Sequence, residues 1–177
     1  MLSMIMAMAD SPEDKRKVEQ LYEKYHRLMY AVAYNILNHY EDAEDATIAS
    51  WEKIIRHLDK ISEIDCKETK SFLVIVVERT AIDFYRKNKR RGALESSFDE
   101  YSSSPFFATR DLRVEETELV LWLRSLPKQY SEVSLLYYVN GFTQREIADL
   151  LGIKENAVAT RLHRARKMLG EELRSNE

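Results

Sequence analysis

Four basic residues near the C-terminal end of the chain recur at positions that one helix would turn outward. They are Arg161, Arg164, Arg166 and Lys167. Guanidinium and ammonium groups attract phosphate oxygens and displace the counterions that surround a nucleic acid. The residues that alternate with them are apolar at helical spacing, which predicts a buried stripe; these are Val158, Leu162, Ala165 and Leu169. A helix with one apolar stripe and a basic remainder is suited to the major groove of DNA.

The residues just before this helix predict a partner helix and a tight turn. Gly141 can adopt the left-handed conformation that ends a helix, and Thr143 with Glu146 fits a capping box that starts the next one. Gly152 suits the following turn. The apolar face between these signals consists of Ile147, Ala148 and Leu151. We interpret the segment as a helix-turn-helix rather than an ordinary helical hairpin with a solvated basic face, because cap, turn, packing and charge agree.

A second basic cluster ends another predicted helix, over about 69–89. It consists of Arg86, Lys87, Lys89, Arg90 and Arg91. The stretch Phe72–Val77 has a strand-like composition, but the apolar period continues through Phe84 and favours a helix. The cluster could bind phosphates or simply be a solvated helix end. Phe84 and Tyr85 could hold unstacked bases or belong to the core.

Composition indicates a mostly helical protein without an overall basic charge. The chain has 177 residues, a net charge of −3, four Gly and three Pro. Nucleic-acid binding would therefore depend on local basic patches, and acidic segments could face a protein partner. We find no nucleophile–base pair, phosphate-binding loop or carboxylate dyad in the sequence, so we do not expect an enzyme.

Cysteine and histidine usage argues against metal chemistry. Cys66 is the single cysteine, which excludes an intramolecular disulfide and a cysteine-based zinc site and is typical of a reducing compartment. The four histidines, at 26, 39, 57 and 163, show no ligand spacing. The N-terminus lacks the basic region of a signal peptide, and no stretch is long enough to span a membrane. We expect a cytoplasmic protein without membrane insertion, metal or cofactor.

The chain divides into two predicted all-α domains joined by a flexible linker. The expected domains are 1–91, with a loose N-terminal tail over 1–11 that could dock, and 111–177. The serine-rich segment 92–110 between them could reach roughly 60 Å when extended, a little under two turns of B-DNA. The predicted helices cover about 12–37, 41–58, 69–89, 111–125, 127–139, 143–151 and 154–173.

These segments resemble a known family in order and spacing. Leu126–Val133, Tyr138–Ala148 and Thr160–Arg166 look like region 4 of sigma-70-type sigma factors. Tyr22–Tyr34, Glu41–Ala46 and Ala81–Lys87 are similar to region 2. The small two-domain members, called the extracytoplasmic-function group, are the most similar. The resemblance implies a helical bundle for the first domain and a helix-turn-helix for the second.

The resemblance also implies partners and site residues. Sigma factors bind core RNA polymerase and direct it to promoter DNA, with region 4 at the −35 element and region 2 binding and melting the −10 element. The basic cluster 86–91 matches the DNA-facing part of region 2. The positions that match the DNA-facing part of region 4 are Glu155, Asn156, Thr160, Arg161 and Arg164. Asp42, Glu44 and Asp45 match the clamp-facing acids, although they could instead complement a helix N-terminus. An anti-sigma factor is a further candidate partner.

Several positions depart from the family pattern towards less polar side chains. They are Ile48, Ala49, Phe72, Val74, Ile75, Ala157 and Ala159, and two more differ in charge or capping, Glu78 and Lys154. Each change removes a polar contact. The departures keep open an alternative function: a sigma-derived DNA-binding regulator that cannot initiate transcription alone.

Overall fold

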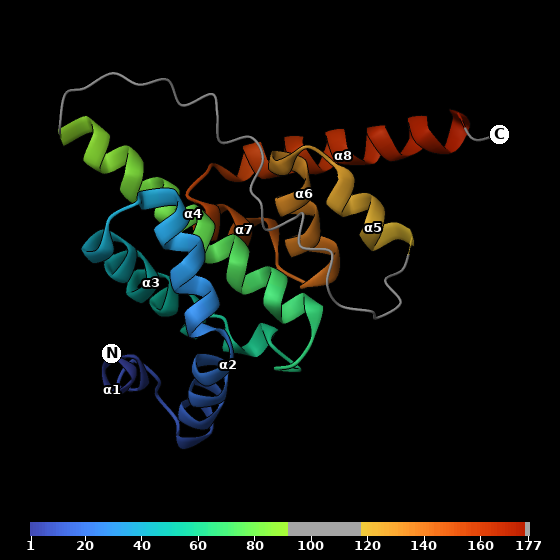
Figure 1. Ribbon diagram of the computed structural model, residues 1–177. Coiled ribbons are helices and arrows are strands. Elements are labelled where there is room, and N and C mark those ends of the chain that lie inside the picture. The colour runs from blue at the N-terminus through green and yellow to red at the C-terminus, as the bar shows by residue number, and fades with distance from the viewer. Residues whose placement is uncertain (92–117, 176–177) are drawn as a thin grey trace. The chain divides into compact units, whose positions relative to one another are not determined.

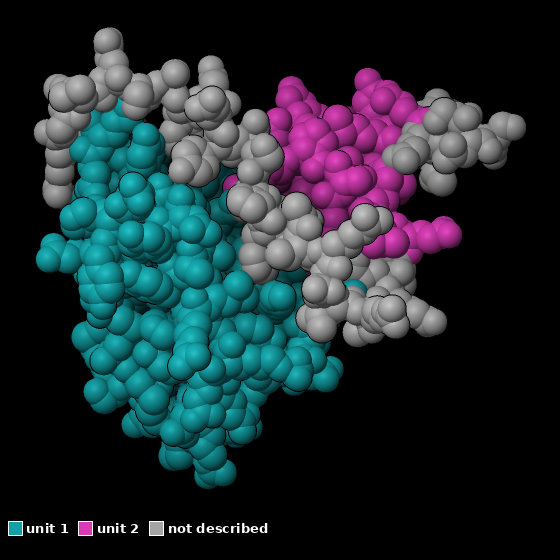
Figure 2. All heavy atoms as spheres, in the orientation of Figure 1, with its two compact units in different colours: residues 1–95 teal, residues 96–177 magenta. Residues whose placement is uncertain are grey.

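The computed structural model describes residues 1–91 and 118–175, and all secondary structure within these ranges is helical (Figure 1). The predicted all-α class is confirmed. The chain forms two compact units, Met1–Glu95 and Ser96–Glu177 (Figure 2). The predicted linker over 92–110 lies outside the described residues, as do positions 111–117 of a predicted helix.

Unit 1 is built on three long helices. Its elements are α1 (Leu2–Met6), α2 (Pro12–Leu37), α3 (Tyr40–Ile55), η1 (Leu58–Lys60) and α4 (Lys67–Arg91). The Ser11 hydroxyl caps α2 by accepting the Asp14 backbone N–H at 3.0 Å, and Pro12 occupies the first turn. The helix ends at Asn38, which adopts a left-handed φ of 48°. The break that we predicted between the helices over 12–37 and 41–58 is present at 38–39, and Tyr40 already begins α3.

The core of unit 1 lies where α2, α3 and α4 pack on one another. Trp51 of α3 is fully buried there, as are Leu21 and Met29 of α2. In α4 every residue from Phe72 to Glu78 is at most 2% exposed. Seven consecutive buried positions exceed the single stripe of an amphipathic helix, which explains why this segment has the composition of a buried strand.

We predicted a tail over 1–11 that is loose or docked, and the structure shows the docked form. Residues 2–6 form α1, which packs on α2, and the side chains of Ile5 and Ala9 are buried. Burial of an apolar side chain supplies the free energy that orders such a segment. The tail is therefore docked, and its Ile5 and Ala9 side chains belong to the core of unit 1.

Within residues 118–175, unit 2 contains five helical elements. They are α5 (Glu118–Ser125), α6 (Lys128–Ser134), the π-helical segment η4 (Leu135–Val139), α7 (Gln144–Leu151) and α8 (Glu155–Ser175). We predicted one helix over 127–139, whereas its last turn widens. The Asn140 N–H donates to the Leu135 carbonyl at 3.1 Å and the Phe142 N–H to the Leu136 carbonyl at 3.0 Å. These wide turns bring Phe142 into the core.

Candidate nucleic-acid interface

The turns around α7 have the geometry that the sequence predicts. Gly141 has a φ of +70° and Gly152 a φ of +64°, conformations that favour glycine. The Thr143 hydroxyl accepts the Glu146 N–H at 3.2 Å, and a Glu146 carboxylate oxygen accepts the Thr143 N–H at 2.8 Å. This reciprocal capping box fixes where α7 begins. The Ile153 N–H, which donates to the Ala148 carbonyl at 3.0 Å, closes the turn into α8.

Packing of α7 and α8 confirms the predicted apolar faces except at Leu169, which is half-buried. The buried residues of α7 are Ile147, Ala148, Leu150 and Leu151, and those of α8 are Val158, Leu162 and Ala165. Leu150 is an addition to the predicted set. Because these side chains occupy one side of α8, its opposite side faces outward along the length of the helix. The elements of a helix-turn-helix are therefore present in the predicted order.

Four of the five residues predicted to contact DNA in unit 2 are exposed. Glu155, Asn156, Thr160 and Arg164 present their side chains outward, and Arg164 Nη1 donates to the Tyr130 hydroxyl at 3.5 Å. Arg161 differs, because its side chain is half-buried and its Nη1 atom is inaccessible to solvent. Arg161 lies at the boundary between the buried stripe and the outer face.

Three further side chains of α8 are exposed; our prediction counted Arg166 and Lys167 in the basic part of this helix but assigned none of the three to DNA contacts. They are His163, Arg166 and Lys167. Asn156, Thr160, His163 and Lys167 follow one another at helical spacing, so they share one side of α8. This helical spacing could have placed His163 and Lys167 beside Asn156 and Thr160, but our assignment of DNA contacts followed the family match. We define the outer face of α8 as Asn156, Thr160, His163, Arg164 and Lys167.

The basic end of α4 is partly open. Arg86 and Lys87 are exposed and Lys89 is half-buried. Arg90 and Arg91 continue the helix, but their side chains lie outside the described part of the chain. Phe84 and Tyr85 are both half-buried.

The three predicted polymerase-binding acids lie on the first turns of α3 but not on one face. Asp45 is exposed, whereas Asp42 and Glu44 are half-buried. The backbone N–H of Asp42 donates to Nδ1 of the capping residue His39 at 3.4 Å. Burial raises the pKa of Tyr22 in α2, and the negative charge of Glu44 raises that pKa further. The acids therefore also have a local role at the start of α3.

The departures from the family pattern fall into two structural groups. Phe72, Val74, Ile75 and Glu78 are buried within α4. The second group lies nearer the surface: Ile48, Ala49, Ala157 and Ala159 are half-buried, and Lys154, directly before α8, is exposed. The first group therefore contributes to the enclosed part of α4, and the exposed charge of this helix lies nearer its C-terminal end.

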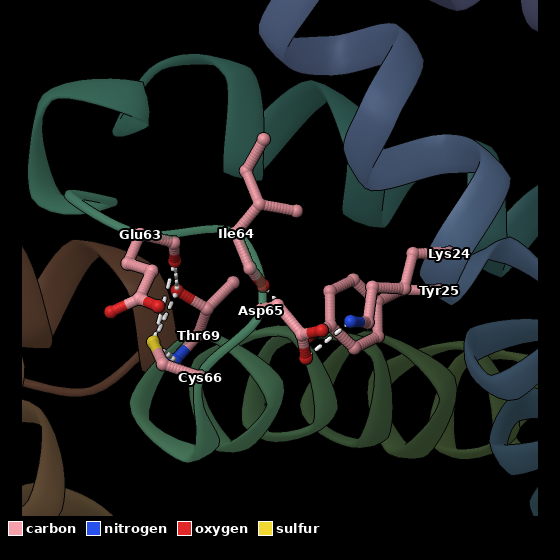
Figure 3. Close-up of polar contacts among 7 residues, drawn as sticks. All are labelled: Lys24, Tyr25, Glu63, Ile64, Asp65, Cys66 and Thr69. Atoms are coloured by element: carbon pink, nitrogen blue, oxygen red, sulfur yellow. Dashed lines mark hydrogen bonds and ion pairs between the residues drawn. The ribbon is translucent and has the colours of Figure 1, made fainter.

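The loop between α3 and α4 is held in place by polar contacts from α2 and α4 (Figure 3). The Tyr25 hydroxyl donates to the Ile64 carbonyl at 2.8 Å, and Lys24 forms an ion pair with Asp65. The Thr69 hydroxyl donates to the Glu63 carbonyl at 2.6 Å, beside the Cys66 thiol. These contacts fix the path of the loop beside the helices.

The described residues form neither a metal-ligand cluster nor a membrane span. In ranges 1–91 and 118–175, no three His, Cys, Asp or Glu side chains come together as metal ligands would. None of the described helices combines the length and the hydropathy of a membrane span.

Comparison with known proteins assigns both units. Residues 21–91 match the family model for sigma-70 region 2, and residues 117–169 match the model for sigma-70 region 4. The chain is 30% identical over 141 residues to the RNA polymerase sigma factor SigV of Bacillus subtilis, covering 79% of this chain and 81% of SigV. It is also 26% identical over 174 residues to the ECF RNA polymerase sigma factor SigW of the same species, covering 91% of each chain. This chain therefore belongs to the sigma-70 family of RNA polymerase sigma factors, in its extracytoplasmic-function group.

Proposed function

We propose that this sigma factor reads the −35 element with the outer face of α8 and binds the −10 element with the basic end of α4. The observation that carries the proposal is the placement of α8. The capping box and the turn at Gly152 set α7 against one side of this helix, and polar and basic residues cover the other side. The groove-facing role is thus supported by local geometry as well as by family membership.

In unit 1 the proposed roles divide between two neighbouring charged regions. Arg86, Lys87 and Lys89, with Arg90 and Arg91 after them, would hold DNA phosphates. The acids Asp42, Glu44 and Asp45 would bind the clamp of core RNA polymerase. Opposite charges at separate places in one small bundle suit a protein that joins DNA to a second protein.

The proposed mechanism needs no catalytic chemistry of the chain's own. Opening a duplex loses stacking and pairing energy, and binding of the separated strand by basic and aromatic groups offsets that loss. Polymerase binding supplies the remainder. The protein would act in the cytoplasm, where an anti-sigma factor could compete for the same faces.

The predicted linker over 92–110 fits simultaneous binding of two promoter elements. Fully extended, 19 residues reach roughly 60 Å, and the elements lie on a duplex whose turn is about 35 Å. A tethered pair of weak DNA-binding units gains affinity because the second binding event is intramolecular.

A second candidate function is a DNA-binding regulator that cannot initiate transcription alone. The observation that favours it is the group of buried apolar residues in α4, where Val74 and Ile75 replace an aromatic and a basic residue typical of the family. A chain without those contacts could bind duplex promoters yet fail to hold the melted strand.

Reconstituted transcription tests the proposal. The full chain is added to purified core RNA polymerase and a promoter template from the same bacterium. We expect promoter-specific transcripts, and we expect the Asp42→Lys/Asp45→Lys variant to lose them together with its affinity for core enzyme. Promoter binding without transcripts would favour the regulator instead.

A further inference from the structure

Two exposed aromatic side chains of unit 1 lie against the same ring. Tyr34 of α2 is 41% exposed and Tyr40, the first residue of α3, is 64% exposed. The Tyr30 ring stacks on that of Tyr34 with centroids 6.1 Å apart and meets Tyr40 edge-on at 5.8 Å. Among the described residues of unit 1, the other large apolar side chains with comparable exposure are Met1 and Met4. Aromatic surface is thus concentrated where α2 ends and α3 begins.

Negative charge adjoins this cluster. Glu41 and Asp42 directly follow Tyr40, and Asp45 lies one turn further along α3. Burial raises the pKa of Tyr30, and the neighbouring Tyr40 and Tyr34 and the charge of Glu44 raise it further. The Tyr30 hydroxyl therefore stays protonated at neutral pH, and its ring lies within electrostatic reach of a carboxylate.

We propose that Tyr30, Tyr34 and Tyr40, together with Glu41, Asp42 and Asp45, form one docking surface for a basic face of core RNA polymerase. We call it the tyrosine–acid surface. The inference rests on the proposed function, because that function assigns Asp42 and Asp45 to polymerase binding. It adds the aromatic part of the contact and specifies that the partner presents Arg or Lys side chains.

The charge of the tyrosine–acid surface favours a basic protein face over DNA or a second copy of this chain. DNA phosphates would be repelled by the carboxylates, and their attraction is to the basic end of α4 instead. A second copy of this chain would bring the same acids against one another across a symmetric contact. A basic protein face matches both components, because guanidinium and ammonium groups pair with carboxylates and stack over tyrosine rings.

Aromatic residues are expected to supply much of the affinity of this contact. Exposed carboxylates at the rim of an interface mainly guide association, whereas buried tyrosines are frequent hot spots. Rings already packed on one another lose little conformational freedom when a partner covers them. Removing the two most exposed rings should therefore weaken binding strongly.

The experiment is a competition titration of full-length variants against labelled wild-type chain on purified core RNA polymerase from the same bacterium. We expect Tyr34→Ala/Tyr40→Ala to weaken binding by roughly tenfold or more. Tyr34→Phe/Tyr40→Phe keeps both rings and should bind within about threefold of the wild type. Tyr138→Ala removes a side chain of unit 2 that is 44% exposed and serves as the matched control, with unchanged affinity.

The outcomes separate this inference from the proposed function. If the wild-type chain does not bind core enzyme, the proposed function fails and the inference with it. If Asp42→Lys/Asp45→Lys loses binding while Tyr34→Ala/Tyr40→Ala binds normally, the function stands and the inference is overturned. It is also overturned if the tyrosine variant binds core enzyme normally but its holoenzyme binds melted promoter DNA weakly, because the rings then contact DNA. A thermal midpoint within a few degrees of the wild type for each variant confirms that binding, not folding, is measured.

Discussion

Asn88 donates a hydrogen bond from its side-chain nitrogen to the Asp42 carboxylate over 3.0 Å. These residues are 46 positions apart in the chain. One belongs to the basic end of α4 and the other to the acidic first turn of α3, so the contact joins the proposed DNA-binding and polymerase-binding regions of unit 1. A substitution that moves Asn88 or Asp42 would therefore break a contact made by the other region.

We predict that Asn88 and Asp42 are coupled in stability. In a double-mutant cycle with Asn88→Ala and Asp42→Ala, the coupling free energy should be about 0.5–1.5 kcal/mol, the net value of one hydrogen bond. Chemical denaturation of the four proteins measures it. Glu52→Ala with Asn88→Ala is the control, since Glu52 pairs with Arg56 instead. Strictly additive effects of Asn88→Ala and Asp42→Ala would show that the contact does not stabilise unit 1.

A second prediction concerns the turn that leads into the helix-turn-helix. No atom lies within 4 Å of a Cβ added to Gly141, whose φ is +70°. Gly141→Ala therefore adds backbone strain without a steric clash, and it should reduce the free energy of unfolding by about 1 kcal/mol. Gly141→Asn should reduce it less, because asparagine tolerates the left-handed region better. Equal stability of the alanine variant and the wild type would argue against a strained turn here.

The same segment shows how much of the fold was readable from the sequence. The capping box, Gly141 and Gly152 are local signals, and the structure bears out each of them because local chemistry determines a cap or a tight turn. The helical period likewise outweighed the strand-like composition of Phe72–Val77. Local signals therefore predicted the elements well.

Features that depend on tertiary packing could not be predicted in this way. The docking of Ile5 and the widened turn at Leu135–Val139 depend on neighbours distant in sequence. Arg161 looked equivalent to Arg164 in the sequence. The two residues are slightly less than one helical turn apart, and this difference places Arg161 beside the buried stripe of α8. The tyrosine contacts were also missed, because Tyr30 and Tyr40 meet only when α2 and α3 pack together.

A third prediction concerns pH and His26. Its Nδ1 atom is buried without a hydrogen-bond partner among the described residues, and its ring stacks on Tyr22 with centroids 4.2 Å apart. Burial lowers the pKa of His26, the positive amino terminus lowers it further, and Glu44 opposes both. The folded chain therefore favours the neutral ring. The unfolded chain, with a pKa near 6.5, binds the proton more readily.

The sign of the effect follows from linkage. Stability from the neutral ring is fully present above about pH 6.5 and is lost as the pH falls below it towards the lowered pKa of the folded state. We expect the free energy of unfolding to fall by up to about 1.4 kcal/mol per pH unit within that window. Denaturation at pH 7.5, 6.5 and 5.5 measures this. His26→Phe keeps the stacked ring and should be less sensitive; an identical pH profile for both proteins would exclude His26 as the cause.

The last prediction separates DNA recognition from folding in α8. Arg164→Ala removes an exposed side chain, so it should weaken promoter binding by about 1–3 kcal/mol if Arg164 contacts a base, with little change in the thermal midpoint. Arg161→Ala should weaken promoter binding and also lower the thermal midpoint, because this side chain is half-buried. Binding is measured by titration of holoenzyme or full chain on promoter DNA, and the midpoint by calorimetry.

Lys167→Ala provides the matched comparison on the same helix. Lys167 is exposed and pairs with Glu171 at 3.8 Å, within the same helix. A lysine that binds phosphate contributes equally to all sequences, so its loss should weaken binding to specific and unrelated DNA alike and reduce the salt dependence by about one ion. Arg164→Ala should instead relax the preference for the specific site. If Arg164→Ala weakens both DNAs equally, Arg164 is a phosphate contact and sequence is read by other residues on the outer face of α8.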